Sequence, residues 1–281
     1  MNAPPPSQAG PEPPVRSDLP FYIGLFVLSG LYVFLISAML LADLAYTTPG
    51  ALLRALTSPE TRYAIKLSLV SCTITTIFSL WVAAPTGYLL SRYKFRGKAL
   101  LDSVLDIPIV LPPLVVGLSL LILFRTAPGI AFETLYERAT GARITYAVAG
   151  VVLAQFMVAC AFAVRTMRAT FDGISPRREQ VALTLGCSRG QAFWSVALPE
   201  ARKGIVVAAT LAWARSLGEF GPILIFAGAT RLKTEVLSTT VFLEMSVGNV
   251  EAAVAVSLLM IIASLFVLVI VRVFGYAEYV R

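Results

Sequence analysis

The sequence has no histidine and few charged residues: only 14% of its 281 residues are charged, while 57% are hydrophobic. Without histidine, the chain cannot form His-based metal sites, His general bases or Ser-His-Asp triads. Its three cysteines are far apart and lack metal-ligand spacing (Cys72, Cys160 and Cys187), so we interpret them as small apolar residues. A soluble domain usually carries about a quarter charged residues, so this composition favours an integral membrane protein with no catalytic residue, cofactor or metal.

Long apolar runs predict six transmembrane helices, because about 20 such residues span a bilayer and the backbone must be helical there. We place the spans at about residues 20–43, 64–92, 99–124, 144–168, 203–228 and 250–273. Residues 1–18 are rich in Pro and Ala, which predicts a disordered tail. Residues 19–275 are then one all-α transmembrane domain.

The positions of Lys and Arg predict the orientation of the spans. Cations concentrate after the second and fourth spans, at residues 92–98 and 165–203. By the positive-inside rule, both termini are expected in the cytoplasm. The cations are divided among loops rather than gathered in one patch, so we expect membrane lipid and no nucleic acid as a partner.

The loop at residues 173–200 is longer than the topology requires and predicts two short helices. A Ser-Pro pair suits the start of the first helix, and Gly186 suits its end in a left-handed conformation. Ser188 and the Gln three residues later fit a capping box that opens the second helix, and Pro199 ends or bends it. The residues alone leave two interpretations open: an amphipathic hairpin on lipid headgroups, or a docking site for a cytoplasmic partner.

The loop reads E-Q-V-A at 179–182, has a Gly at 186, and reads V-A-L-P at 196–199. This pattern resembles the EAA loop of ABC importer permeases. Gln and Val replace two alanines of the family pattern, and Val replaces an Ile. The resemblance implies a type I ABC importer permease whose loop couples to a separate ATPase subunit. The coupling residues would be Glu179, Ala182, Gly186, Leu198 and Pro199.

Two further segments, in the third and fifth predicted spans, combine charged residues with Pro and Gly. Residues 106–117, DIPIVLPPLVVG, are similar to the D-x-P-x-x-L-P-P-x-V-x-G stretch of molybdate-type permeases. Residues 214–222, ARSLGEFGP, are similar to the A-R-x-x-G-E-F-G segment of the molybdate, tungstate and sulfate group, although Pro ends the segment where Ala is usual. The resemblance implies import of molybdate or tungstate first and sulfate next. The alternatives are an ABC permease for phosphate or an amino acid, and a secondary transporter.

The sequence contains no G-x-x-x-x-G-K-[ST] phosphate loop, so the chain cannot hydrolyse ATP by that route, and we expect that it is not an enzyme. The resemblance implies cytoplasmic ABC ATPase subunits, an extracytoplasmic solute-binding protein and a second permease copy, with a homodimer expected.

The two oxyanion-type segments supply the candidate translocation pathway and gate. Arg215 and Glu219 are four residues apart and can pair, either to fix helix packing or to line the route of a dianion. The Pro and Gly residues of the third span predict one of two features: an ordinary kink, or a break that lines a cavity. In the second case Leu111, Leu114 and Val115 would form an apolar gate that closes the pathway. The assigned residues are Asp106, Leu111, Pro112, Pro113, Gly117, Arg215, Gly218, Glu219 and Gly221.

Overall fold

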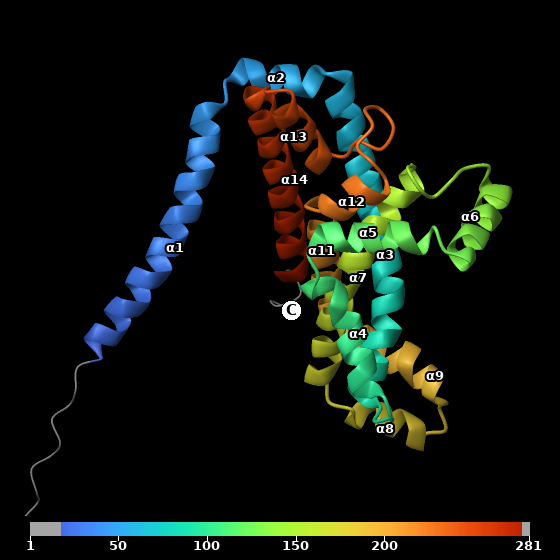
Figure 1. The fold of residues 1–281 in the computed structure, drawn as a ribbon. Helices are drawn as coiled ribbons and strands as arrows, with labels where there is room; N and C mark the ends of the chain where they lie inside the picture. The colour runs from blue at the N-terminus through green and yellow to red at the C-terminus, as the bar shows by residue number, and fades with distance from the viewer. Residues whose placement is uncertain (1–17, 277–281) are drawn as a thin grey trace, which may run out of the picture. The chain divides into compact units, whose positions relative to one another are not determined.

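The structure is a computed structural model that describes residues 18–276 (Figure 1). The expected tail, apart from its last residue, lies outside the described residues. The chain divides into two units between Tyr46 and Thr47, and α1 (Leu19–Tyr46) forms the first unit by itself. It is a continuous 28-residue apolar helix. All other elements belong to the second unit, and the described residues contain helices and no strand, which confirms the all-α prediction.

Four helices among the described residues are long and apolar enough to cross a membrane. They are α1, α3 (Pro59–Arg92), α7 (Val148–Gly173) and α14 (Val250–Tyr276). Each corresponds to a predicted span. Helix α3 runs through an internal proline without ending.

The other two predicted spans are interrupted. Residues 99–124 form α4 (Lys98–Val110) and α5 (Pro113–Leu123), and the chain bends by 113° between these two helices. Residues 203–228 form α11 (Arg202–Leu217) and the short α12 (Gly221–Phe226). The predicted number of six continuous spans is therefore not reproduced: the described residues hold four, or five if the bent pair counts as one span.

Three helices outside the spans were not expected from the sequence. They are α2 (Pro49–Thr57), α6 (Ala127–Thr140) and α13 (Leu237–Ser246), which lie at the end of the second unit opposite α8 and α9 or project from its side (Figure 1). Threonine side chains cap the first turns of α2 and α6, and a proline follows each cap. A search for apolar runs long enough to span a membrane does not reveal helices of 9 to 14 residues.

Helix α6 is tied to the chain before α7 through Glu133. Burial of this carboxyl opposes its ionisation, but Thr145 donates to it from its N–H, 3.0 Å away, and from its hydroxyl. Arg143 lies 3.7 Å from the same carboxylate. The favourable contacts outweigh burial, so the pKa of Glu133 lies below its ordinary value.

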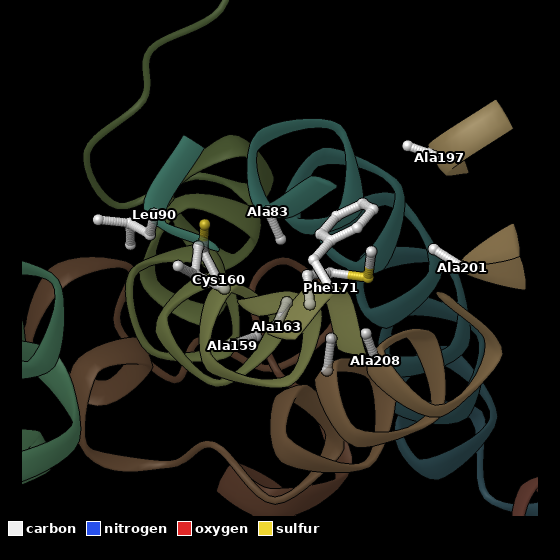
Figure 2. Packing of buried hydrophobic residues seen from close by; sticks show 12 residues of the cluster. Ala83, Leu90, Ala159, Cys160, Ala163, Phe171, Ala197, Ala201 and Ala208 are labelled. Carbon is white, nitrogen blue, oxygen red and sulfur yellow. The ribbon is translucent and has the colours of Figure 1, made fainter. Parts of the chain in front are cut away.

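The core of the second unit is built on α3, α7 and α11, which approach closely through small residues (Figure 2). A Cβ atom added to Gly87 on α3 would lie 2.8 Å from the Met167 Cβ and the Arg168 N on α7. One added to Gly204 on α11 would lie 2.1 Å from Thr170 on α7. Small residues allow membrane helices this proximity, so the three helices form the frame that holds the rest.

The predicted short helices of the 173–200 loop are present. They are α8 (Arg177–Thr184) and α9 (Arg189–Ala192), followed by a π-helical turn (Phe193–Ala197) and the single turn α10 (Leu198–Glu200) that leads into α11. In Figure 1 α8 and α9 lie at one end of the second unit, whereas α5 and α12 lie across its middle.

Candidate functional site

The first break in the bundle is the turn between α4 and α5. Leu111 and Pro112 have extended backbones, with ψ of 141° and 134°. Each of them precedes a proline, and the proline ring disfavours the helical conformation of the preceding residue. The Leu111 N–H still completes α4 by donating to the Ile107 carbonyl, 2.9 Å away. Pro113 then begins α5, where its missing N–H costs nothing.

The second break separates α11 from α12 at Gly218, Glu219 and Phe220. Two side chains from other helices donate hydrogen bonds to carbonyl groups at this break. Gln155 of α7 donates from Nε2 to the Ser216 carbonyl at 3.2 Å, and Ser238 of α13 donates from Oγ to the Glu219 carbonyl at 2.7 Å. A broken helix inside a membrane needs such partners, because unpaired backbone groups are costly there.

The two breaks pack directly on each other. A Cβ atom added to Gly117 of α5 would lie 2.7 Å from the Pro222 Cα of α12. One added to Gly221 of α12 would lie 2.9 Å from the Leu114 N of α5. Both contacts are with backbone atoms, which cannot swing away as a flexible side chain does. The structure thus brings together the two segments that the sequence separates by about a hundred residues, and glycine is required at both contacts.

Arg215 and Glu219 form the expected ion pair, with Nη1 and Oε2 2.6 Å apart. The Glu219 side chain is 1% exposed, while that of Arg215 is 29% exposed. The Arg215 guanidinium also lies 5.8 Å from the centre of the Phe162 ring. The ion pair neutralises the charge beside the second break, yet neither carboxylate oxygen has a partner in hydrogen-bond geometry among the described residues.

Asp106, the other charged residue assigned to the pathway, is paired as well. It contacts Arg165 of α7 rather than any residue of the second break. By contrast, apolar residues beside the first break are exposed: Val110 is 80% exposed and Leu114 is 50% exposed. The surface next to the break is therefore apolar, and the rest of the second unit does not cover it.

Glu179 of the 173–200 loop is buried against α3. Its carboxylate accepts from the Tyr88 hydroxyl at 2.8 Å and from Arg92 Nε at 3.0 Å. Arg92 also donates to the carbonyls of Phe171 and Ile174, at 2.8 and 2.9 Å. One arginine at the end of α3 thus holds both the end of α7 and the start of α8.

The other loop residues divide between the interior and the solvent. Ala182 is buried, Leu198 is half-buried and Pro199 is exposed. The largest exposed apolar side chains are Leu185, 81% exposed, and Trp194, 68% exposed.

Two local patterns predicted for the loop are confirmed. Gly186 has a φ of +91°, the left-handed conformation that glycine adopts without strain. Ser188 and Gln191 form the reciprocal capping box at the start of α9. The first helix begins one residue later than the Ser-Pro pair suggests, because Pro176 is its N-cap and Arg177 its first residue.

Sequence reasoning missed the side chains that hold the site in place. Arg92 was counted as a topology signal only, and Tyr88 was not singled out. Gln155 had a signal that could have found it, since it is a lone amide in an apolar span. Ser238 had none, because it belongs to a helix that was not predicted.

Comparison with known proteins places the whole arrangement in one family. Residues 76–276 match the family model described as "Binding-protein-dependent transport system inner membrane component". The sulfate transport system permease protein CysT of Escherichia coli is 35% identical over 213 residues, 76% of each chain. The molybdenum transport system permease protein ModB of Escherichia coli is 38% identical over 187 residues, 66% of this chain and 80% of ModB.

A third relative and a solved structure agree with this. The molybdate/tungstate transport system permease protein WtpB of Pyrococcus abyssi is 34% identical over 208 residues, 72% of this chain and 77% of WtpB. A chain of a bacterial alginate ABC transporter, solved in complex with a pentasaccharide-bound periplasmic protein, has a similar fold. It aligns with a TM-score of 0.71 at 15% identity, over 90% of this chain and 93% of that chain.

Proposed function

Since the chain belongs to the family of binding-protein-dependent transport system inner membrane components, we propose that it is the permease subunit of an ABC importer for a tetrahedral oxyanion. Molybdate or tungstate is the first choice of substrate and sulfate the next. The observation that carries this proposal is the contact between the two breaks, through Gly117 and Gly221, in the two segments typical of oxyanion permeases. The names of the relatives, CysT, ModB and WtpB, support the substrate class.

The 173–200 loop is the docking site for a cytoplasmic ATPase subunit in this proposal. Arg92 and Glu179 anchor the loop rigidly to the ends of α3 and α7. Leu185 and Trp194 present apolar surface that a groove on the ATPase would cover. Glu179, Ala182 and Gly186 therefore serve coupling by shaping the loop, while Leu198 and Pro199 carry its movement into α11.

The gate is proposed to form at the first break, between two copies of the permease. Val110 and Leu114 leave an apolar surface that the rest of the second unit does not cover, and we place the second copy against it, where close packing would stabilise the contact. The Pro and Gly residues let α5 bend away from α4, so Leu111, Leu114 and Val115 can close a dry constriction. A dianion crosses such a constriction only when the two copies separate.

Charge balance beside the second break suits passage rather than storage of an anion. An unpaired arginine would hold a dianion too tightly for release, since arginine forms strong charge-assisted hydrogen bonds with oxyanions. The Glu219 carboxylate, 2.6 Å from Arg215, offsets that attraction. Arg215 remains partly exposed, so it can meet a passing anion briefly.

Transport would proceed by alternating access. With the termini and the 173–200 loop in the cytoplasm, ATP-driven closure of the ATPase pair would move the two loops together. The helices would then turn from the inward-facing to the outward-facing state, where a solute-binding protein delivers the anion. Nucleotide acts only through its different affinity for the two states.

The test is uptake by the permease reconstituted in proteoliposomes with its ATPase and solute-binding protein. Radiolabelled molybdate should enter when ATP is enclosed with the ATPase, and unlabelled tungstate should compete strongly and sulfate less. Preferred uptake of phosphate or an amino acid would refute the oxyanion assignment. Uptake without nucleotide would indicate a secondary transporter instead.

A further inference from the structure

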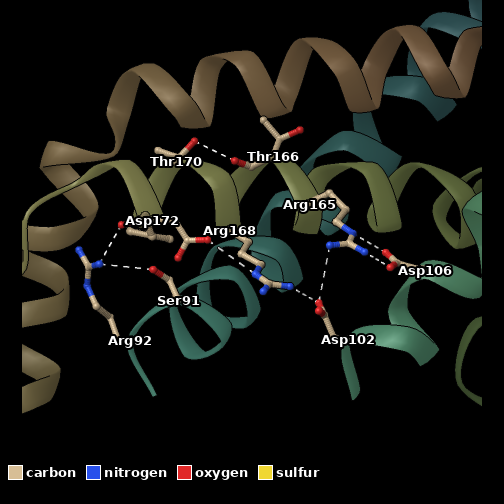
Figure 3. Close-up of polar contacts among 10 residues, drawn as sticks. Ser91, Arg92, Asp102, Asp106, Arg165, Thr166, Arg168, Thr170 and Asp172 are labelled. Carbon is tan, nitrogen blue, oxygen red and sulfur yellow. Dashed lines mark hydrogen bonds and ion pairs between the residues drawn. The ribbon is translucent and has the colours of Figure 1, made fainter. Parts of the chain in front are cut away.

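Four charged side chains join α4 to α7 in the half of the bundle nearest the 173–200 loop. Asp106 of α4 pairs with Arg165 of α7, and Asp102 of α4 pairs with Arg168 of α7. Arg165 also lies 3.8 Å from Asp102, so the pairs are linked rather than separate. Figure 3 shows them in a row along α7, with Arg165 between the two aspartates. We call these four residues the ion-pair ladder.

The attachment of α4 depends on the ladder to an unusual degree. Helix α4 contains no buried residue. Apart from the ion pairs, it contributes only the partly buried Leu101 and Leu105 to the core formed by α3, α7 and α11. Charges at membrane depth are costly unless they are paired, so removing one partner of the ladder leaves an uncompensated charge as well as a looser helix.

The ladder also fixes the register of the two helices. They are antiparallel, so Asp102 meets Arg168 while Asp106, one turn later on α4, meets Arg165. If α4 slid one turn toward the 173–200 loop, Asp102 would move toward Asp172, which already lies 3.7 Å from Arg168. Two like charges would then be brought together. A slide of one turn the other way would move Asp106 from Arg165 to the uncharged Ala161 and Phe162. Sliding is opposed in both directions, so α4 must move with α7 or detach from it.

The two ends of this assembly are the parts that the proposed function needs to connect. At one end, Arg92 holds the carbonyls of Phe171 and Ile174, next to the loop that carries Glu179. At the other end, α4 stops at the first break, at Leu111. The ladder lies between them.

We infer that Asp102, Asp106, Arg165 and Arg168 make α4 and the end of α7 move as one body, so that displacement of the 173–200 loop reaches the gate. These are positioning residues for the coupling of ATP hydrolysis to transport, an inference that rests on the proposed function. A ladder of ion pairs suits this task because it resists sliding while leaving α4 free to turn with α7.

The first arm of the test measures uptake and ATP hydrolysis together in the reconstituted complex. Asp106→Asn should lower the number of anions carried per ATP at least threefold, and Asp102→Asn combined with Asp106→Asn at least tenfold, while ATP hydrolysis stays within twofold. Asp106→Glu keeps the charge and should retain at least half of the wild-type ratio. Glu251→Gln is the matched control elsewhere, since Glu251 pairs with Arg54 between α14 and α2 at 3.4 Å; its ratio should not change.

The second arm needs no substrate. Spin labels are placed at Leu100→Cys on α4 and Ser175→Cys beyond α7, both exposed positions, with Cys187→Ser to remove the partly exposed native thiol. Labelled protein is diluted with unlabelled copies, and the distance is measured in the complex with and without trapped nucleotide. The distribution of distances between the two labels should have one narrow peak in both nucleotide states. This peak should broaden in the variant with both Asn substitutions.

The outcomes separate the ladder from the proposed function. A ratio of uptake to hydrolysis that is unchanged by the Asn substitutions, or uptake and hydrolysis that fall together, would overturn the inference. An unchanged narrow distance in the double Asn variant would overturn it as well. If the wild-type complex carries no oxyanion, the proposed function fails, and the label distances still decide whether the ladder holds α4 to α7.

Discussion

Replacing Glu179 by alanine tests how the 173–200 loop is held. The carboxylate is almost fully buried, and it accepts from both Tyr88 and Arg92. Its removal leaves the Arg92 guanidinium, only 12% exposed, without its counter-charge. Breaking a buried ion pair costs about 3–5 kcal/mol. Because Arg92 keeps its two carbonyl acceptors, we take the lower end, about 3 kcal/mol, as the loss of local stability of α8.

The local opening of α8 should therefore become about 100-fold more frequent, since each 1.4 kcal/mol is a factor of ten. Hydrogen exchange of the amides of α8, measured by mass spectrometry on the protein in lipid nanodiscs, reports this opening. Glu179→Gln keeps a neutral acceptor for Tyr88 and Arg92. In this variant the backbone amides of α8 should therefore exchange at a rate between those of wild type and Glu179→Ala.

The control is Glu251→Ala, which removes an exposed ion pair at the other end of the bundle and should leave exchange in α8 unchanged. Exchange in α8 that stays within twofold of wild type in Glu179→Ala would refute the reasoning. It would mean that the loop is held by its apolar contacts rather than by the buried carboxylate.

Four further substitutions test other parts of the structure. Gly186→Ala forces a side chain into a left-handed backbone at a cost of about 1–2 kcal/mol, so uptake should fall while membrane insertion persists; Gly190→Ala, in a right-handed helix, should change little. Gly117→Ala puts a methyl group 2.7 Å from the backbone of α12, so the melting temperature and uptake should both fall, by about 1–3 kcal/mol in stability. Gln155→Leu removes one of the donors to the Ser216 carbonyl at the second break, and since the Glu219 N–H still donates to that carbonyl we expect a loss of about 0.5–1.5 kcal/mol in thermal unfolding. Glu133→Gln should lower stability at neutral pH but not in acid.

The pH dependence expected for Glu133 follows from the direction of its shift. Its pKa is lower in the folded protein than in the unfolded chain, so its contribution is complete above the unfolded value, about 4, and is lost as the pH falls through the folded value. Melting temperatures of wild type and Glu133→Gln should therefore differ at pH 7 and converge in acid. A difference that grows as the pH falls would contradict this assignment.

The controls for the other variants are equally direct. Gly50→Ala is matched to the Gly117 substitution, because nothing lies within 4 Å of the added Cβ, and its melting temperature should be unchanged. For Gln155→Leu, equal stability to wild type would show that the break does not need the amide. For Gly186→Ala, uptake at the wild-type level would undermine the role of the loop.

The parts of this fold that were predictable are those that local chemistry determines. A left-handed turn at Gly186 and a capping box at Ser188 need only neighbouring residues, and both are present. The break at Pro112 was also foreseeable, since consecutive prolines exclude a regular helix there. Apolar runs located the long segments of the bundle but not α13, although its Leu237 is buried in the core.

The remaining features depend on residues that are distant in sequence. Glu179 meets Tyr88 and Arg92 across about 90 residues, and nothing local shows that its carboxylate turns inward rather than toward a partner. The second interruption, at Gly218, was not predicted, because the apolar run continues through it. Its stability comes from Gln155 and other side chains on separate helices.

The central claim is that the helices of this membrane domain change between the inward-facing and outward-facing states only when an ATPase binds the 173–200 loop, which Arg92 and Glu179 anchor. The most direct test is molybdate uptake into proteoliposomes that contain the permease, its ATPase and its solute-binding protein, with either ATP or a non-hydrolysable analogue supplied to the ATPase side. The account predicts accumulation with ATP and none beyond a single turnover with the analogue. Equal accumulation under both conditions would contradict it.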